Sequence, residues 1–161
     1  MGVRAVEHRA INLRVNGRPT AVAVAPETPL IFVLRNDVGV KGVRMGCCAG
    51  DCMACTVLID GRPQQACTLP VSSADNMNIE TVESLHDTEA GRSLIESFIA
   101  EQAGQCGYCL AGILMRAKAL LDTRAAASHE EIVAAIDGHL CRCGAHTRIV
   151  RAIARASGLR A

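Results

Sequence analysis

The chain has 161 residues, a net charge of +1 at neutral pH, one Tyr, two Phe and no Trp. This length allows one domain or two small ones. The balanced charge and the scarcity of aromatic side chains argue against a nucleic-acid-binding protein, which would need a basic surface or a platform for stacking bases. No apolar run reaches the roughly 18–20 residues that cross a bilayer, so direct membrane insertion is not expected.

The N-terminal segment Met1–Ala10 lacks the apolar core and the cleavage site of a secretory signal peptide. A cytoplasmic location is therefore expected, with one alternative: a folded complex that already holds its cofactors can reach the periplasm on the twin-arginine signal of a partner. Nine cysteines in a chain without an export signal indicate metal binding more often than disulfides.

The first half of the chain predicts a small sheet that begins with a hairpin. Apolar residues alternate with polar ones over residues 11–15 and recur over 21–24, and Asn16-Gly17 between them is typical of a hairpin turn. The dipeptide Thr28-Pro29 predicts a helix start, with Thr28 as the N-cap and Pro29 at the first helical position.

The rest of this half predicts one long loop and three further strands. Glycines and polar residues are interspersed with the cysteines of residues 38–54, which is typical of an irregular loop. Strands are predicted at residues 56–59, 64–68 and 78–82, and this pattern places Cys67 on a strand.

After residue 86 the apolar residues recur with a helical period. Four helices are predicted, and their apolar stripes begin at Leu94, Leu110, Ile132 and Ile149. The third starts with the capping-box pattern of Ser128 and Glu131, and the fourth should run over residues 146–156. The fold class predicted from these patterns is α+β, with a β-rich part followed by helices.

Eight of the nine cysteines fall into two sets of four. The first set has the C-x4-C-x2-C spacing and the distant fourth cysteine of a plant-type [2Fe–2S] ferredoxin; it comprises Cys47, Cys52, Cys55 and Cys67. Structural zinc also takes four cysteines, but its sites usually come as two short knuckles, so zinc is the less favoured alternative. Glycines suit such a loop because they let the backbone approach the cluster closely; here they are Gly42, Gly46 and Gly50.

The second set consists of a C-x2-C pair and a C-x-C pair: Cys106, Cys109, Cys141 and Cys143. Its spacing alone leaves an iron–sulfur cluster and structural zinc both open. If both sets hold clusters, the chain carries two one-electron centres and its function is an electron relay.

The motifs that contain these cysteines resemble those of one known family. They are Gly46-Cys47, Cys52, Ala54-Cys55-Thr56-Val57, Gln105-Cys106-Gly107-Tyr108-Cys109 and Leu140-Cys141-Arg142-Cys143-Gly144. In this order they resemble the small iron–sulfur subunit of the xanthine oxidase family of molybdenum hydroxylases. The resemblance implies a plant-type ferredoxin (β-grasp) domain over residues 8–85 and a four-helix-bundle domain over residues 86–161, each with one [2Fe–2S] cluster.

The resemblance also implies roles for particular residues. Cys47, Cys52, Cys55 and Cys67 would bind the outer cluster, and Cys106, Cys109, Cys141 and Cys143 the inner one. Gln105 would hydrogen-bond the molybdopterin cofactor of a large partner subunit, and Cys143 would lie beside that pterin. Electrons would run from molybdenum through the inner and outer clusters to cytochrome c or an FAD-binding subunit. No catalytic residue is expected in this chain.

The run from Cys141 to His146 resembles the isoquinoline, nicotinate and aldehyde dehydrogenase branch, which implies an N-heteroaromatic or aldehyde substrate for the complex. Two positions depart from the family pattern. Met53 replaces a usual Gly and would either cover the outer cluster or lie on the surface without a role, and Cys48 is a spare thiol. Two other functions stay open: a stand-alone ferredoxin-like shuttle and a zinc-stabilised interaction module.

The five histidines show no ligand spacing. His146 is expected to be a polar residue at a helix N-terminus, and most of His8, His86, His129 and His139 are expected to be solvated or to cap helices.

Overall fold

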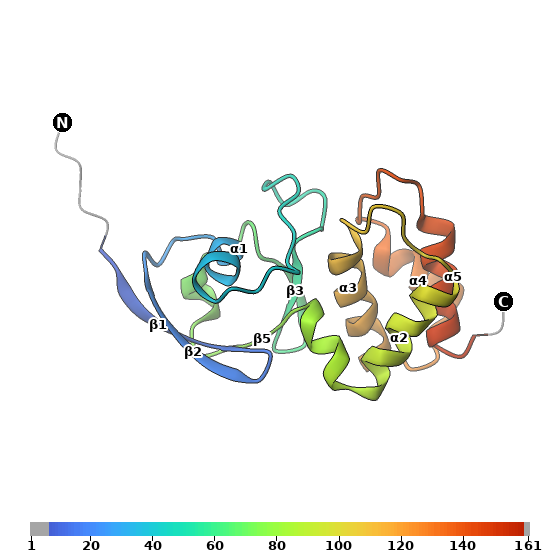
Figure 1. Ribbon diagram of the computed structural model, residues 1–161, viewed down its shortest axis with the longest axis horizontal. Coiled ribbons are helices and arrows are strands. Elements are labelled where there is room, and N and C mark those ends of the chain that lie inside the picture. Colours follow the sequence, from blue (N-terminus) through green and yellow to red (C-terminus); the bar gives the residue numbers. More distant parts are fainter. Residues whose placement is uncertain (1–6, 160–161) are drawn as a thin grey trace.

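The computed structural model describes residues 7–159 and has an N-terminal sheet beside a C-terminal group of helices (Figure 1). The predicted α+β class is confirmed. The expectation about a signal peptide falls largely on residues 1–6, which lie outside the described part, as do the last two residues of the predicted helical domain. No helix among the described residues has the length and apolar character of a membrane span.

Five strands form one sheet in the order β2-β1-β5-β3-β4. Their bounds are β1 Arg9–Val15, β2 Arg18–Val24, β3 Thr56–Ile59, β4 Arg62–Gln65 and β5 Asn78–Glu80. Strand β5 runs parallel to β1 and antiparallel to β3, so it joins the two hairpins into one sheet. The hairpin predicted at Asn16-Gly17 is confirmed, and both turn residues have the positive φ that a tight hairpin turn requires.

The first helix differs slightly from its prediction. Helix α1, Leu30–Phe32, continues as a π-helical segment, Val33–Asp37, and its apolar residues are largely buried against the sheet. The helix begins at Leu30, and the Thr28 side chain does not cap it. The reason is that Pro29 remains extended, with ψ 132°, where it forms a β-bridge with Pro70.

The predicted return strand is also shifted, and Cys67 does not lie on it. The two-residue turn at Asp60-Gly61 pairs Ile59 directly with Arg62, so β4 starts two residues earlier than predicted and ends at Gln65. Cys67 lies in the turn that follows. Strand β5 was predicted to end at residue 82 but ends at Glu80, because a 3-10 segment, Val82–Asp87, begins at Val82.

The four predicted helices are confirmed as α2 Glu89–Ala100, α3 Leu110–Thr123, α4 His129–Ile136 and α5 His146–Ala156. The capping box of α4 is formed in both directions: the Ser128 amide donates to the Glu131 carboxylate at 2.8 Å, and the Glu131 amide donates to the Ser128 hydroxyl at 3.2 Å. The apolar faces of the helices share one core around Phe98, Ile113 and Ile149.

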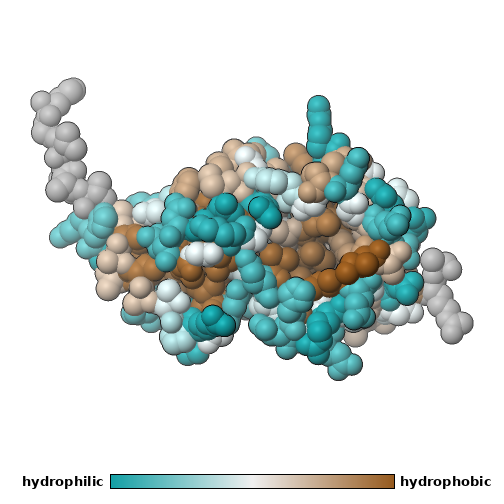
Figure 2. Space-filling view, in the orientation of Figure 1, coloured by the Kyte–Doolittle hydropathy of each residue, from teal (hydrophilic) through white to brown (hydrophobic). Residues whose placement is uncertain are grey.

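A third apolar cluster joins the sheet to the helices. It consists of Leu58 on β3, Leu85, and Met115 and Ala119 on α3. Nearby, Lys118 of α3 forms an ion pair with Glu80 of β5 at 3.3 Å. On the side of the molecule drawn in Figure 2, apolar residues are visible over both the sheet part and the helical part, with hydrophilic residues around them. The two parts therefore pack against each other through a buried apolar seam.

Candidate metal centres

The loop from Gly46 to Cys52 is folded around two sulfur atoms. The amides of Ala49, Asp51 and Cys52 donate to the Cys47 Sγ at 3.3–3.4 Å, and the Cys47 amide donates to the Cys52 Sγ at 3.3 Å. These donors, first those of Ala49 and Cys52, lower the pKa of Cys47 to about 6. The loop thus stabilises a thiolate, the form in which cysteine binds a metal.

Gly46 is the residue that allows this close approach. A Cβ at Gly46 would lie 2.4 Å from the Cys52 Sγ. Any side chain here would therefore displace a sulfur of the first set, as the predicted role of Gly46 requires, whereas a Cβ at Gly42 would meet the Val82 side chain instead.

The other two cysteines of the first set flank strands of the sheet. Cys55 precedes β3, and Cys67 lies in the turn after β4; both are buried. Burial, together with the neighbouring Cys67 thiol, raises the pKa of Cys55 to about 12. Cys47 thus contacts Cys52, and Cys55 lies near both Cys67 and Cys52, so the first set is gathered in one place.

The second set is brought together by the helices. Cys109 lies at the N-terminus of α3, Cys106 precedes it, and Cys141 and Cys143 lie between α4 and α5. The Cys106 thiol lies near Cys143 and Cys141, and Cys109 lies near Cys141 and Cys106, so the four cysteines come together. Burial raises the pKa of Cys109 to about 12, whereas the Tyr108 amide lowers the pKa of Cys106.

Four cysteines gathered in this way supply the ligands that a [2Fe–2S] cluster needs. Each iron of a [2Fe–2S] cluster takes two protein ligands. A structural zinc ion would instead need all four sulfurs about 2.3 Å from one point.

The segments that carry the two sets touch each other. The Leu140 amide, one residue before Cys141, donates to the carbonyl of Cys52 at 3.3 Å. The Tyr108 hydroxyl, from between Cys106 and Cys109, donates to the Met45 carbonyl at 2.5 Å. The structure thus places the two candidate centres in adjoining loops, which their separation in the sequence could not indicate.

Gln105 and Cys143 are the residues predicted to lie near the pterin of a partner. Gln105 is exposed in the loop between α2 and α3, and Cys143 is half-buried. Leu140, in the neighbouring segment, is an apolar side chain with 62% of its surface exposed. These positions leave the second centre accessible to another subunit.

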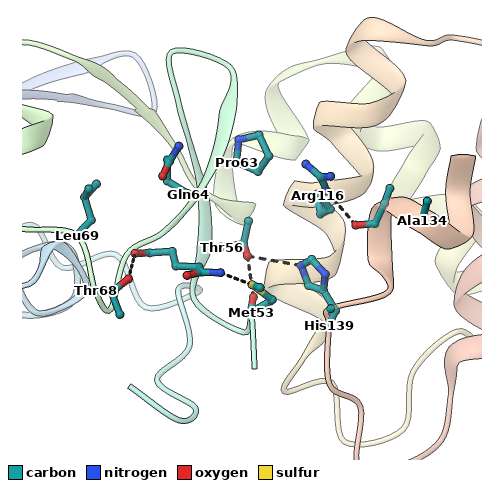
Figure 3. Close-up of a pocket in the computed structure, with 12 residues that line it drawn as sticks. Met53, Thr56, Pro63, Gln64, Thr68, Leu69, Arg116, Ala134 and His139 are labelled. Atoms are coloured by element: carbon teal, nitrogen blue, oxygen red, sulfur yellow. Dashed lines mark hydrogen bonds between the residues drawn. The ribbon is translucent and has the colours of Figure 1, made fainter. Parts of the chain in front are cut away.

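Met53 lies in a cleft between the sheet and the helices, near Thr56 and His139 (Figure 3). Its φ of 59° is in the left-handed region that favours glycine. Its sulfur accepts from the Gln65 amide, and its methyl group lies close to Gly138. With Arg116 of α3, these residues line a cavity of about 410 Å³.

Cys48 is exposed, also with a positive φ, and the sulfur contacts join Cys47 rather than Cys48 to Cys52. This agrees with its prediction as a spare thiol.

His139 is the residue that sequence reasoning missed. His8, His86 and His129 are exposed, but His139 is buried, its Nε2 lies 3.5 Å from the Thr56 hydroxyl, and its Nδ1 has no hydrogen-bond partner among the described residues. Burial, reinforced by the charge of Arg116, lowers its pKa to about 4. The only signal for His139 in the sequence was its place directly after Gly138 and two residues before the candidate ligand Cys141.

His146 begins α5 as predicted, and its Nε2 lies 2.8 Å from the His139 carbonyl.

Comparison with family models identifies both parts of the chain. Residues 13–85 match the model of the 2Fe-2S iron-sulfur cluster binding domain, and residues 81–154 match the [2Fe-2S] binding domain. Together they cover nearly all of the described residues.

Comparison with curated proteins finds relatives of similar length. The chain is 46% identical to one of the subunits of nicotinate dehydrogenase from Pseudomonas putida over 150 residues, 93% of this chain and 96% of the relative. It is 42% identical to the alpha chain of isoquinoline 1-oxidoreductase from Brevundimonas diminuta over 148 residues, 91% of this chain and 97% of the relative.

Solved structures show the same arrangement. Quinoline 2-oxidoreductase from Pseudomonas putida 86 matches with a TM-score of 0.86 and 36% identity, covering 94% of this chain and 97% of the matched chain. The aldehyde oxidoreductase from Desulfovibrio desulfuricans matches with a TM-score of 0.87 and 34% identity, over 94% of this chain and 17% of the larger protein.

Proposed function

Because the chain belongs to the family of small iron–sulfur subunits of the molybdenum hydroxylases related to xanthine oxidase, we propose that it relays electrons within such a complex. They would pass from the molybdopterin centre of a large partner subunit through two [2Fe–2S] clusters to an external acceptor. The gathering of eight cysteines into two sets of four, carried by adjoining loops, is the observation that carries this proposal.

The residues of this chain fit two clusters. A [2Fe–2S] cluster, when bound, supplies a centre that gains and loses one electron. We assign the first set, from Cys47 to Cys67, to the outer cluster and the second, from Cys106 to Cys143, to the inner cluster. The amide donors around Cys47 would stabilise the charge on its sulfur, and the burial of Cys55 would exclude water from its side of the outer cluster.

We propose that the inner centre faces the large subunit. Exposed Gln105 would donate or accept a hydrogen bond at the pterin, and Cys143 would lie beside it. Exposed Leu140 would supply apolar contact to the same partner, because a large apolar side chain left in solvent next to a functional loop favours protein contact.

The relatives favour a substrate class for the complex. Their names refer to nicotinate, isoquinoline and quinoline. We therefore infer that the complex oxidises an N-heteroaromatic compound, with an aldehyde as the second choice, and that the acceptor is cytochrome c or an FAD-binding subunit. We divide the chain into a ferredoxin domain over residues 8–85 and a helical domain over 86–161.

Electron paramagnetic resonance of the dithionite-reduced chain, with iron and zinc counted on the same sample, tests the proposal. Two distinct signals and about four iron atoms per chain are expected, as two [2Fe–2S] sites require. One signal, with zinc at the second cysteine set, would exclude the inner cluster from the electron path. Size-exclusion chromatography after co-expression with the large partner provides a second test, because a stand-alone shuttle would elute without it.

A substitution of one inner ligand gives the first mutational prediction. Cys109→Ser should abolish the inner-cluster signal, lower the iron content by about half, and uncouple substrate oxidation from the external acceptor. Cys48→Ser is the matched control, since this exposed thiol should leave both signals intact. Normal turnover of Cys109→Ser with the external acceptor would contradict the proposed path.

A further inference from the structure

Tyr108 connects the two cysteine loops through its side chain. It lies between Cys106 and Cys109, but its hydroxyl donates to the carbonyl of Met45, 63 residues away, at 2.5 Å. The guanidinium carbon of Arg44 lies 5.8 Å from the centre of the Tyr108 ring, within the range of a cation–π interaction. Both contacts are with the stretch that leads into Cys47.

Packing alone does not account for this orientation. Tyr108 is 46% exposed, so its ring is only partly buried. Met45, in contrast, packs against the apolar core of the sheet. The tyrosine hydroxyl therefore attaches the second loop to a fixed point of the first, two residues before Cys47.

A second link joins a different segment of the inner set, the one between α4 and α5, to the outer-cluster loop: the Leu140 amide donates to the Cys52 carbonyl at 3.3 Å. This link uses only backbone groups, so side-chain substitution does not remove it. The Tyr108 link can be removed with the loss of a single oxygen atom.

We propose that Tyr108 is a positioning residue: it holds the inner-cluster loop against the outer-cluster loop and so sets the distance and orientation between the two clusters. The inference rests on the proposed function, because both clusters must be present. Tunnelling of an electron falls steeply with distance, so a small loosening of one loop would slow transfer between the clusters while each cluster remains intact.

The test uses the cluster-loaded chain and compares wild type with Tyr108→Phe. The variant should retain both cluster signals and the full iron content. The magnetic interaction between the two reduced clusters should change, and hydrogen exchange at the amides of residues 46–47 should become about fivefold faster, as loss of one hydrogen bond implies. Electron transfer between the clusters after photoreduction should slow.

Two further variants separate the positioning role of Tyr108 from a general effect of removing a side-chain contact. Arg44→Gln removes the cation over the ring and leaves the hydroxyl, so a smaller change in the same direction is expected. Thr20→Val removes a hydroxyl hydrogen bond on the edge strand β2 and should leave the magnetic interaction unchanged.

The outcomes are distinct. Unchanged magnetic interaction and exchange in Tyr108→Phe, with two clusters present, would overturn the positioning role and leave the proposed function standing. A wild-type chain without two [2Fe–2S] signals would overturn both. If Tyr108→Phe loses iron, Arg44→Gln decides: a changed interaction supports the role, and an unchanged one overturns it.

Discussion

Gly112 shows how a single hydrogen atom in place of a side chain brings the two parts together. It is buried in α3, and a Cβ there would lie 2.2 Å from the Met53 carbonyl oxygen. That oxygen cannot move freely, because it accepts hydrogen bonds from the Thr56 amide at 3.2 Å and from the Thr56 hydroxyl at 2.8 Å. The contact lies between candidate ligands Cys52 and Cys55.

Gly112→Ala should therefore destabilise the protein. Alanine favours a helix by about 1 kcal/mol over glycine, but forcing a methyl group against fixed backbone costs about 1–3 kcal/mol. Because the contact is with fixed backbone, we expect the clash to outweigh the helix preference, with a net loss of up to about 2 kcal/mol in urea unfolding.

Gly138→Ala is the control for this prediction. A Cβ at Gly138 would lie 3.4 Å from the methyl group of Met53, the end of a flexible side chain that can move aside. Equal stabilities of the two variants would show that the Gly112 contact is not tight.

At the scale of elements, local signals predicted most of the structure. The hairpin at Asn16-Gly17 and the capping box of α4 depend on neighbours within a few residues, so a pattern reveals them. Cys67 was misplaced because the Asp60-Gly61 turn, rather than apolar alternation, sets the register of β4. Burial of His139 depends on Thr56, 83 residues away, and no local pattern indicates such a contact.

The same distinction between local patterns and long-range contacts applies to the candidate site. Spacing alone grouped the eight cysteines into two sets, because ligand spacing is a property of the chain. That the two sets lie in adjoining loops depends on the bonds of Tyr108 and Leu140 to the first loop, which form only after folding.

Ser128 provides the prediction at this scale. Ser128→Ala removes the hydroxyl that accepts from the Glu131 amide and should cost about 1 kcal/mol. For a chain of this size the melting temperature should fall by about 2–4 °C, measured by thermal unfolding. Ser128→Asp keeps an accepting oxygen at the N-cap and should remain close to wild type; an equal loss in both variants would argue against the capping role.

At the scale of the whole molecule, the seam of Leu58, Leu85, Met115 and Ala119 determines whether sheet and helices unfold together. Leu58 is on β3 and fully buried, and its neighbours Met115 and Ala119 belong to α3. The contact is apolar and shared, so neither part can open it without exposing both. We therefore expect the chain to unfold as one cooperative unit although two family models match it.

Leu58→Ala tests this cooperativity. Removing a fully buried leucine side chain should cost about 2–5 kcal/mol, and hydrogen exchange should become faster in β1 of the sheet and in α5 of the helical part alike. Met77→Ala, at an apolar side chain that is 37% exposed, should change stability by less than about 0.5 kcal/mol. Faster exchange in β1 with unchanged protection of α5 would instead mean that the two parts unfold independently, and the relative placement of the two cysteine sets would then depend on the loop contacts of Tyr108 and Leu140 rather than on the seam.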